Sequence, residues 1–369
     1  MRQKMFYWGV VFAFLLNGCG GDNAYDGKNG LGGSSSSSSV GVLDSIQKNI
    51  FSSNADILLS KLNETEQTLD AFDSNLSTDE VKKLQESFTQ IISSWKKVEA
   101  LYVASEYDDE LRTMPINIDF FNKGKNLDVA KNINYVLNLE GELKANQLTN
   151  PSKTVTGLEY LLFGNQESVT ELQTQLNKDN RKRIEVIKLS IAKIKTNALL
   201  IQNFYKKDTK FKANLEESLN IVVNTLVQGT FDLRELRIGE AAGFINKTKG
   251  DPKAERLEYY RSKKSLEAIK SVLIAHQQMM GKQSFSNFGS FASEKGADTV
   301  VKKIQSNIKN ALAITEEFSA PIQESITPAL VDEKVKRLYD EITDLQKNYF
   351  ESLINALNLT ADIIEADGD

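Results

Sequence analysis

Apolar residues return every three or four positions through most of the chain from Val42 onward, which is the spacing of one face of an α-helix. The whole sequence of 369 residues holds only 5 prolines, and no segment has a clear two-residue alternation of apolar and polar positions. That alternation is the usual mark of a half-buried strand. We therefore predict an all-α protein.

The clearest helix begins at Ser77-Thr78-Asp79-Glu80. In this capping box the serine side chain and Glu80 each satisfy a free backbone N–H group of the other residue. The apolar residues that follow keep helical spacing: Val81, Leu84, Phe88, Ile91, Trp95, Val98 and Tyr102. They form one stripe, which predicts a core helix.

Further segments with helical periodicity predict a bundle architecture. They are Asn54–Leu69, Val169–Phe204, Leu215–Ile238, Leu257–Met280, Val300–Thr315 and a last helix with Val335, Leu338, Ile342, Leu345, Tyr349, Ser352 and Ala356. Alternating spacings of three and four are typical of helices that pack in bundles. The length suits two related helical bundles of the up-down four-helix type, which we place at residues 42–205 and 206–369.

Two stretches interrupt the helical pattern, 111–126 and 282–296. Loops on a rigid scaffold often carry function, although many only connect helices over the surface. The second stretch contains Phe285, Phe288 and Phe291. We expect these rings to pack onto the bundle.

The first residues read as a secretory leader. Arg2 and Lys4 precede the short apolar stretch Phe6–Leu16, which is too brief for a typical transmembrane helix. The sequence Leu16-Asn17-Gly18-Cys19 resembles the bacterial lipobox, in which the cysteine carries the lipid and becomes the first mature residue. We expect a signal peptide over 1–18, a lipid on Cys19, and a flexible tether of glycine and serine over 19–41.

The expected location is the bacterial cell envelope, with the membrane as a partner through Cys19. Gly20, rather than an acidic residue, follows the cysteine, which favours the outer membrane and a body that faces the periplasm. Cys19 is the only cysteine, so a disulfide within the chain and a thiol nucleophile elsewhere are excluded.

The body has an ordinary globular composition, with 40% hydrophobic and 26% charged residues. The formal net charge is −5, and removal of residues 1–18 leaves 43 basic against 50 acidic residues, or −7. An acidic chain of this kind does not favour a nucleic acid as partner.

The single histidine, His276, excludes several kinds of catalytic site. Zinc sites rich in histidine, the H-E-x-x-H pattern and iron sites with two histidines all need more imidazoles. His276 also falls in an apolar series with Val272 and Met280, which indicates a core residue. The chain has neither a G-x-S-x-G elbow nor a glycine loop for phosphate.

The most informative stretch is Thr154-Val155-Thr156-Gly157-Leu158-Glu159-Tyr160-Leu161-Leu162-Phe163-Gly164. It resembles the signature of the imelysin family, in which G-x-H-x-x-E is followed by an apolar run. Glu159 and the run Tyr160–Gly164 are kept here. Thr154 stands at the position of the glycine and Thr156 at that of the histidine.

Other segments extend the resemblance over most of the body. Trp95–Leu101 is similar to the helix before the family's first loop. The stretch 116–122 resembles the family's Ile-Asp-x-Trp-Pro element, with Phe121 and Asn122 at the last two positions. Glu258–Ser265 resembles its Glu-Ser-x-x-Ser-x-x-Ser helix.

The resemblance implies a pair of helical bundles with a polar pocket between them, in an exported protein that is often lipid-anchored and associated with iron uptake. Some imelysin-like proteins are described as metallopeptidases, and others are thought to lack proteolysis. Carried over to this chain, the resemblance gives Asp119, Thr156, Glu159 and Ser262 as candidates for ligand binding. It gives no catalytic residue.

The loss of the motif histidine changes the expected chemistry. A threonine hydroxyl is a poor ligand for a transition metal and a poor general base beside imidazole. Glu159 is then the one metal candidate of the motif, together with other carboxylates around a hard ion. The cofactor stays unknown, with a metal ion as one alternative. Glu159 could equally lie on a solvated helix face or be held by a basic partner.

Three functions fit these observations. The leading one is a binding protein without catalysis, which takes a small ligand, an iron species or other metal complex, or an envelope protein at the cleft between bundles. The second is a divergent metallopeptidase that uses Glu159. The third is a helical scaffold that holds envelope partners. Because Thr156 replaces the histidine, we favour a protein that is not an enzyme.

Overall fold

The structure is a computed structural model, and it describes residues 36–72, 75–121, 126–178 and 181–361. The predicted signal peptide, Cys19 and most of the predicted tether lie outside these residues. The first helix, α1, spans Ser36–Ile46 and therefore begins inside the segment 19–41 that we expected to be a tether. Val42, Leu43 and Ile46 are buried, so the core begins within this helix.

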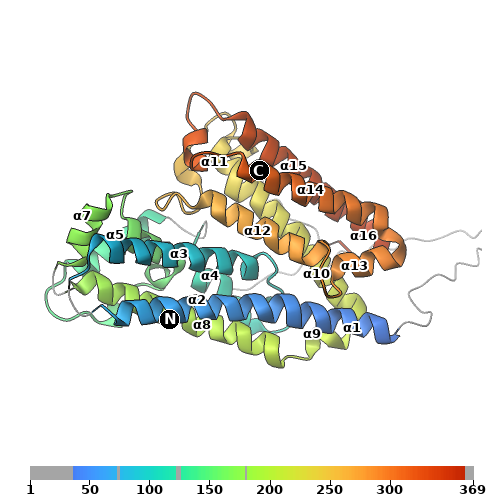
Figure 1. The fold of residues 1–369 in the computed structure, drawn as a ribbon, viewed down its shortest axis with the longest axis horizontal. Helices are drawn as coiled ribbons and strands as arrows, with labels where there is room; N and C mark the ends of the chain where they lie inside the picture. The colour runs from blue at the N-terminus through green and yellow to red at the C-terminus, as the bar shows by residue number, and fades with distance from the viewer. Residues whose placement is uncertain (1–35, 73–74, 122–125, 179–180, 362–369) are drawn as a thin grey trace, which may run out of the picture. The chain divides into compact units, whose positions relative to one another are not determined.

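The first helices along the chain form what we call the N-terminal helix group. A π-helical turn at Gln47–Ser52 joins α1 to α2 (Ser53–Asp70), and α2 packs against α3 (Thr78–Glu99) and α8 (Lys182–Lys207). Shorter helices lie between α3 and α10: α4 (Met114–Ile118), α5 (Asn126–Leu137), α6 (Val155–Phe163), α7 (Val169–Leu176) and α9 (Lys210–Ala213). Figure 1 shows α2, α3 and α8 side by side, from blue to yellow-green.

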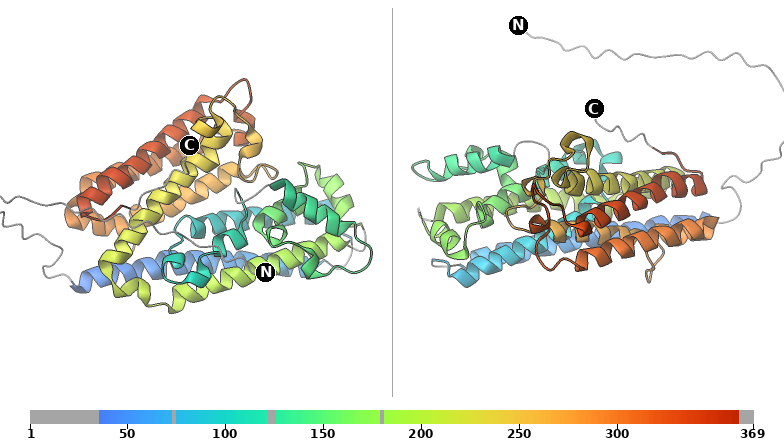
Figure 2. Two further views of the ribbon diagram at one scale, coloured as in Figure 1. Left: turned by 180° about the vertical axis from the view of Figure 1, so that it is seen from behind. Right: turned by 90° about the horizontal axis from the view of Figure 1, so that it is seen from above.

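The remaining helices form the C-terminal helix group. Its long members are α10 (Leu215–Arg234), α12 (Ser265–Met280), α14 (Asp298–Glu316) and α15 (Glu333–Lys347). Helix α15 packs against α10 and α14, and α12 packs against α14 and against α3 of the first group (Figure 2). The short helices are α11 (Glu240–Ala242), α13 (Phe288–Ala292) and α16 (Ile354–Leu357).

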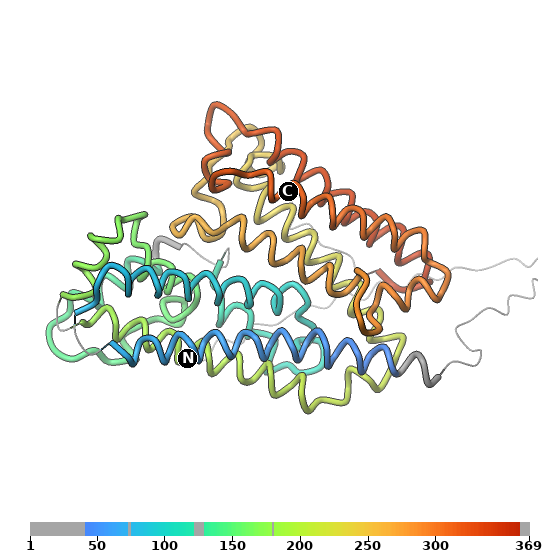
Figure 3. The backbone as a smooth tube through the Cα atoms, viewed as in Figure 1, coloured from blue at the N-terminus to red at the C-terminus, as the bar shows by residue number. Residues whose placement is uncertain are grey.

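Among the described residues there is no strand, and the one isolated bridge joins Ile326 to Val331. The all-α prediction is confirmed. The backbone trace in Figure 3 follows the chain through both helix groups. Within the described ranges, no helix combines the length and the apolar character that a membrane crossing needs.

The predicted core helix is confirmed in detail. Ser77 and Glu80 form the expected reciprocal cap at the start of α3. Of the predicted stripe, the residues from Val81 to Val98 are buried and Tyr102, beyond the end of the helix, is partly buried. Phe288 and Phe291 are also buried, so the aromatic loop packs onto the helices as expected.

Two predicted helices have the wrong extent. The segment Val169–Phe204 is divided into α7 and α8. The Asn177 side chain hydrogen-bonds to the N–H and to the C=O group of Leu76, and Arg181 adopts a left-handed φ of 64°, so one continuous helix does not form. In the segment Leu257–Met280, α12 begins only at Ser265. The part before it forms turns, which carry residues of the candidate site.

The last helix keeps the predicted stripe only as far as Tyr349. A π-helical turn follows at Asn348–Leu353 and advances the register of the helix by one residue. Leu353, Ile354 and Leu357 are therefore buried there, whereas Ala356, a predicted core position, is exposed.

Candidate functional site

Helix α6 carries the Thr156 and Glu159 candidates, and glycines at two positions fix where it lies. Gly157 packs so closely on the preceding turn that a Cβ atom there would lie under 3.0 Å from the Ser152 carbonyl oxygen. Gly164 ends the helix with a φ of 54°, in the left-handed region that favours glycine. Both glycines belong to the motif that the sequence singled out.

The C-terminal end of α6 is held by a buried arginine of α8. The Arg183 Nε group donates to the carbonyl of Leu161 at 2.9 Å, and its Nη2 group donates to that of Tyr160 at 3.0 Å. The Leu161 carbonyl is among the last four of the helix, which lack a partner within it, whereas the Tyr160 carbonyl also accepts from the Gly164 amide at 2.9 Å. Arg183 thereby holds the end of α6 in contact with α8.

The turn before α12 faces α6 from the C-terminal helix group. Tyr259 and Lys263 both adopt positive φ values, of 54° and 59°, which prevent a regular helix here. The Ser265 hydroxyl donates to the Glu258 carbonyl across the turn. This backbone path turns the amide and the hydroxyl of Ser262 toward Glu159.

Glu159 lies at the wall of a cavity between the two helix groups. Its side chain is buried, with 6% exposure of the residue, and its Oε1 atom accepts hydrogen bonds from the Ser262 amide at 2.9 Å and hydroxyl at 2.8 Å. The cavity measures about 550 Å³, and we call it the Glu159 pocket. Its lining residues are Phe121, Thr156, Glu159, Asn165, Gln166, Glu255, Leu257, Glu258, Tyr259, Tyr260 and Arg261.

Burial raises the pKa of Glu159 to about 7, and the nearby Asp119 carboxylate also raises it. The two bonds from Ser262 and the charge of Arg261 favour the ionised form and oppose this rise. At neutral pH the group therefore exists both as a carboxylate and as a carboxylic acid. It can accept or donate a hydrogen bond to a molecule in the pocket.

Thr156 and Asp119 meet at the same wall. The Thr156 hydroxyl donates to the Asp119 Oδ1 atom at 2.9 Å and accepts from the Phe120 amide at 3.1 Å. The Tyr259 hydroxyl donates to the other carboxylate oxygen at 2.5 Å. Thr156 thus has a structural role, because it fixes the chain after α4 beside α6.

Behind this wall lies a group of charges, all buried except the partly exposed Glu99, that we call the charge cluster: Lys96, Glu99, Asp119, Arg237 and Glu258. The Lys96 Nζ atom contacts carboxylate oxygens of Glu99 at 2.7 Å, of Asp119 at 2.9 Å and of Glu258 at 2.6 Å. Arg237 holds Glu258 at 2.9 Å and Glu99 at 2.7 Å. The cluster joins the two helix groups.

The electrostatics of the cluster keep its central pair ionised. Burial alone would lower the pKa of the Lys96 ammonium, but Asp119, Glu258 and Glu99 together raise it above its ordinary value. Burial likewise favours protonation of Asp119. The charge of Lys96, with hydrogen bonds from Tyr259 and Thr156, outweighs it and holds the pKa of Asp119 below its ordinary range.

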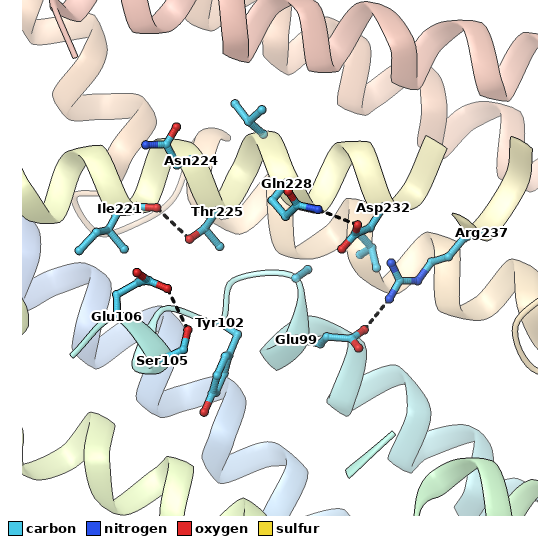
Figure 4. Close-up of a pocket in the computed structure, with 14 residues that line it drawn as sticks. Glu99, Tyr102, Ser105, Glu106, Ile221, Asn224, Thr225, Gln228, Asp232 and Arg237 are labelled. Atoms are coloured by element: carbon cyan, nitrogen blue, oxygen red, sulfur yellow. Dashed lines mark hydrogen bonds and ion pairs between the residues drawn. The ribbon is translucent and has the colours of Figure 1, made fainter. Parts of the chain in front are cut away.

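The cluster reaches a second cavity, of about 340 Å³, between α10 and the end of α3 (Figure 4). Figure 4 shows Glu99 of this cavity in contact with Arg237, while Gln228 and Asp232 pair beside them. Glu258, by contrast, lines the Glu159 pocket. The charge cluster therefore forms the partition between two cavities.

The residues present do not fit a transition metal. In the described part of the chain, no group of three or more histidine, cysteine, aspartate or glutamate residues could hold a metal ion. The Asp119 carboxylate is already neutralised by Lys96, and the Glu159 oxygen that faces Ser262 takes two hydrogen bonds. The Thr156 hydroxyl adds only a weak ligand.

The structure brings the predicted candidates together in pairs, Thr156 with Asp119 and Ser262 with Glu159, while Cys19 lies outside the described residues. Their role as a binding site stays a prediction. The surface alternative for Glu159 is wrong, since the side chain is buried. His276 is fully buried with its Nδ1 atom 3.2 Å from the Tyr349 hydroxyl, as expected for a core residue.

The ionic partners of these candidates were not predicted from the sequence; they are Lys96, Arg237 and Glu258. One signal for Lys96 was available. It follows Phe88 and Ile92 at intervals of four, so it continues a buried line of α3. A lysine in that place predicts a buried carboxylate partner.

Replacement of Glu159 by glutamine is expected to change how stability depends on pH. The carboxyl has a folded pKa of about 7 against an ordinary 4.5, so the folded state binds more protons between these values. The stability that this proton contributes is fully present below about pH 4.5 and is lost as pH rises through 7. Glutamine stays neutral.

The Glu159→Gln variant should therefore gain stability over the wild type as pH rises from 5 to 8, by up to roughly 3 kcal/mol. Urea unfolding at a series of pH values measures this difference. Glu86→Gln changes an exposed carboxyl of α3 and serves as the control. A difference that stays constant between pH 5 and 8 would refute the raised pKa.

A family model described as imelysin, whose name is that of a peptidase family, matches residues 52–349. No curated protein matches the sequence.

Two solved structures share the fold. The crystal structure of an imelysin-like protein from Psychrobacter arcticum 273-4 has a TM-score of 0.67 at 14% identity, covering 88% of this chain and 96% of that one. A protein from Parabacteroides distasonis ATCC 8503, assigned as an iron-regulated protein A precursor, has a TM-score of 0.65 at 12% identity. Here the match covers 86% of this chain and 95% of the other.

Proposed function

Because this chain belongs to the imelysin family, we propose that it binds a small polar ligand in the Glu159 pocket and cleaves nothing there. The observation that carries the proposal is the buried Glu159 carboxyl at the wall of a cavity of about 550 Å³. Ligand sites are usually concave, with a few convergent polar groups and a titratable residue of shifted pKa. The Glu159 pocket has each of these properties.

The lining suits a ligand with several hydrogen-bonding groups. Asn165 and Gln166 offer amides at the exposed side, and Arg261 offers a guanidinium that is stacked 5.1 Å over the Tyr160 ring. Leu257 and the aromatic rings give apolar surface between them. Hexoses, dipeptides and ferric citrate represent the chemistry to be tested, the last because an iron-regulated protein shares the fold.

The groups that line the pocket support the proposal that no peptide is cleaved there. A metallopeptidase needs a metal to polarise the carbonyl or to activate water, and the residues around Glu159 do not fit one. Glu159 can exchange a proton, but no nucleophile or oxyanion donor set accompanies it among the lining residues that the structure describes. The chemistry of this site therefore supports binding rather than hydrolysis.

Arg261→Ala should weaken binding of any pocket ligand by about tenfold or more, since it removes the one cationic group among the described residues of the lining. Thermal shift with hexoses, dipeptides and ferric citrate identifies a compound, and titration calorimetry measures its Kd before and after EDTA treatment. The wild-type Kd should be unchanged by EDTA, and Glu86→Gln should bind like the wild type.

Two results would contradict this proposal. Equal affinity in Arg261→Ala and the wild type would place the ligand elsewhere. EDTA-sensitive cleavage of unfolded casein, absent in Glu159→Ala, would favour the metallopeptidase instead. If no compound shifts the melting temperature, a role in holding an envelope protein becomes the better account.

We also propose that the protein is anchored to the bacterial cell envelope through a lipid on Cys19, facing the periplasm from the outer membrane. The lipobox-like sequence 16–19 supports this proposal. Cys19→Ala should abolish incorporation of labelled palmitate and move the protein from the membrane fraction to the soluble fraction. Ser34→Ala, in the same segment, should change neither. A membrane-bound Cys19→Ala protein would refute the lipid anchor.

A further inference from the structure

The single histidine, His276, leaves one of its ring nitrogens without a partner in the core. The side chain is fully buried on α12, and its Nδ1 atom lies 3.2 Å from the Tyr349 hydroxyl. The Nε2 atom has no hydrogen-bond partner among the described residues. Burial lowers the pKa of His276 to about 4, so the imidazole is neutral at pH 7. A buried polar atom in this state is costly, and a bound molecule can satisfy it.

The Tyr349 hydroxyl determines which ring nitrogen carries the hydrogen. It is buried, and the Nδ1 atom of His276 is its hydrogen-bond partner among the described residues. If the hydroxyl donates to Nδ1, only the Nε2–H donor remains unpaired. If Nδ1–H donates instead, the phenolic hydrogen and the Nε2 lone pair both remain unpaired. Because the first arrangement leaves fewer buried groups unsatisfied, Nε2 carries the hydrogen and needs an acceptor.

The Nε2 atom lies behind Gly229, at the wall of the second cavity. A Cβ atom built on Gly229 would lie 3.3 Å from Nε2 and 3.3 Å from the Ala100 carbonyl oxygen. Gly229 and Ala100 line this cavity of about 340 Å³, and so does Val272, which precedes His276 by one turn of α12. We call the space left by the missing side chain, between the Ala100 carbonyl and Nε2, the Gly229 niche. It places the unpaired donor next to the cavity.

The cavity also carries an excess of negative charge. Its lining includes the carboxylates of Glu99, Glu106 and Asp232 against the guanidinium of Arg237. Figure 4 shows Glu99 and Glu106 on the side opposite α10, the helix that carries Asp232. Lys96 and Arg237 both contact Glu99, but each also holds a carboxylate outside the cavity, so they neutralise this excess only in part. The lining therefore favours a positively charged ligand.

We propose that this cavity is a second binding site, for a small hydroxylated amine whose ammonium group lies among the carboxylates and whose hydroxyl group occupies the Gly229 niche. A hydroxyl oxygen accepts the hydrogen of His276 Nε2, and its own hydrogen can be donated to the Ala100 carbonyl. The volume is at the lower end of the range for small-molecule sites, roughly 300–1,000 Å³, which suits a single amino sugar. This site does not depend on which ligand the Glu159 pocket binds.

Binding of glucosamine to the full chain tests the site, in calorimetry at about pH 6, where its amine is an ammonium group. N-acetylglucosamine lacks the charge and should bind at least about tenfold more weakly. Gly229→Ala fills the niche and should weaken glucosamine binding by about tenfold or more. Its melting temperature should change by less than about 4 °C, because Gly229 has an ordinary helical backbone and alanine is a better helix former.

Nitrogen-15 NMR provides an independent readout, because labelled histidine gives one imidazole in this chain. The wild type should have its hydrogen on Nε2, and glucosamine should shift the Nε2 resonance more than that of Nδ1. Arg261→Ala changes the Glu159 pocket and should keep both the affinity for glucosamine and this shift. If Arg261→Ala loses glucosamine while Gly229→Ala keeps it, the sugar lies in the Glu159 pocket and the proposal is overturned.

Three other results would overturn the proposal: no binding of glucosamine, equal binding of N-acetylglucosamine, or an Nε2 resonance that does not move at saturation. If Gly229→Ala does not fold, His276→Phe combined with Tyr349→Phe removes the Nε2 donor and its hydroxyl partner together, and keeps the two rings packed. This double variant should also bind glucosamine about tenfold more weakly, and unchanged affinity would contradict the role of Nε2.

Discussion

Replacement of Arg237 by methionine is expected to cost about 3–5 kcal/mol of unfolding free energy, because it leaves the carboxylates of Glu258 and Glu99 to share the single charge of Lys96. Arg237 holds Glu258, which is buried, at 2.9 Å and Glu99 at 2.7 Å. Breaking one partner of a buried ion pair costs much more than breaking a surface pair. Urea unfolding followed by circular dichroism measures the loss.

Arg234 provides the matched control, since it lies one turn away and its pair with Glu235 is more exposed than the pair of Arg237 with Glu258. Arg234→Met should cost less than about 1 kcal/mol. Glu258→Gln in the Arg237→Met background should recover part of the lost stability, because it removes the uncompensated charge. Equal losses from Arg237→Met and Arg234→Met would mean that the charge cluster does not hold the two helix groups together.

Replacement of Gly157 by alanine should have the second large effect, a loss of about 1–3 kcal/mol with a displaced α6. The new Cβ atom would lie under 3.0 Å from the Ser152 carbonyl oxygen, which belongs to the backbone and cannot simply rotate away. The helix must shift, and Thr156 and Glu159 flank the glycine on either side. The bonds from Ser262 to Glu159 should therefore be lost.

Gly289→Ala is the control that separates a loss of stability from a change in the geometry of the site. It creates the same kind of clash, with the Met280 carbonyl oxygen, in the C-terminal helix group. Both variants should unfold at lower urea concentration. The gain in stability from Glu159→Gln at pH 8 should persist in the Gly289→Ala background and should change in the Gly157→Ala background. If both backgrounds keep it unaltered, Gly157 does not position Glu159.

Much of the fold could be predicted because local signals and burial agree. The cap at Ser77 and the stripe of α3 each point to the same helix, and the structure contains it. The segment before Ser265 was wrongly predicted as part of a helix, because its residues have helical propensity whereas long-range contacts determine its conformation. Gln323, for example, reaches Ser265 from 58 residues away. Such contacts leave no periodic trace.

The candidate site, like the fold, could be predicted from the sequence only in part. Family resemblance led to Glu159, Thr156 and Ser262, although their contacts could not be known. The partners of the charge cluster lie far apart in sequence, 162 residues for Lys96 and Glu258 and 138 for Arg237 and Glu99. Only the packing of α3 against the C-terminal helix group brings them together. Sequence spacing on α3 could indicate that Lys96 is buried and pairs with Glu99, but it could not indicate the partners from other helices.

The central claim is that this site is built around a lysine ammonium and a protonatable carboxyl, with no metal ion. Crystals of the wild type grown with manganese, iron and zinc salts, with anomalous scattering recorded at each absorption edge, test it most directly. The account predicts no anomalous peak within bonding distance of Asp119, Thr156 or Glu159, and an intact contact between Lys96 and Asp119. A metal peak that bridges Thr156 and Glu159 would contradict it.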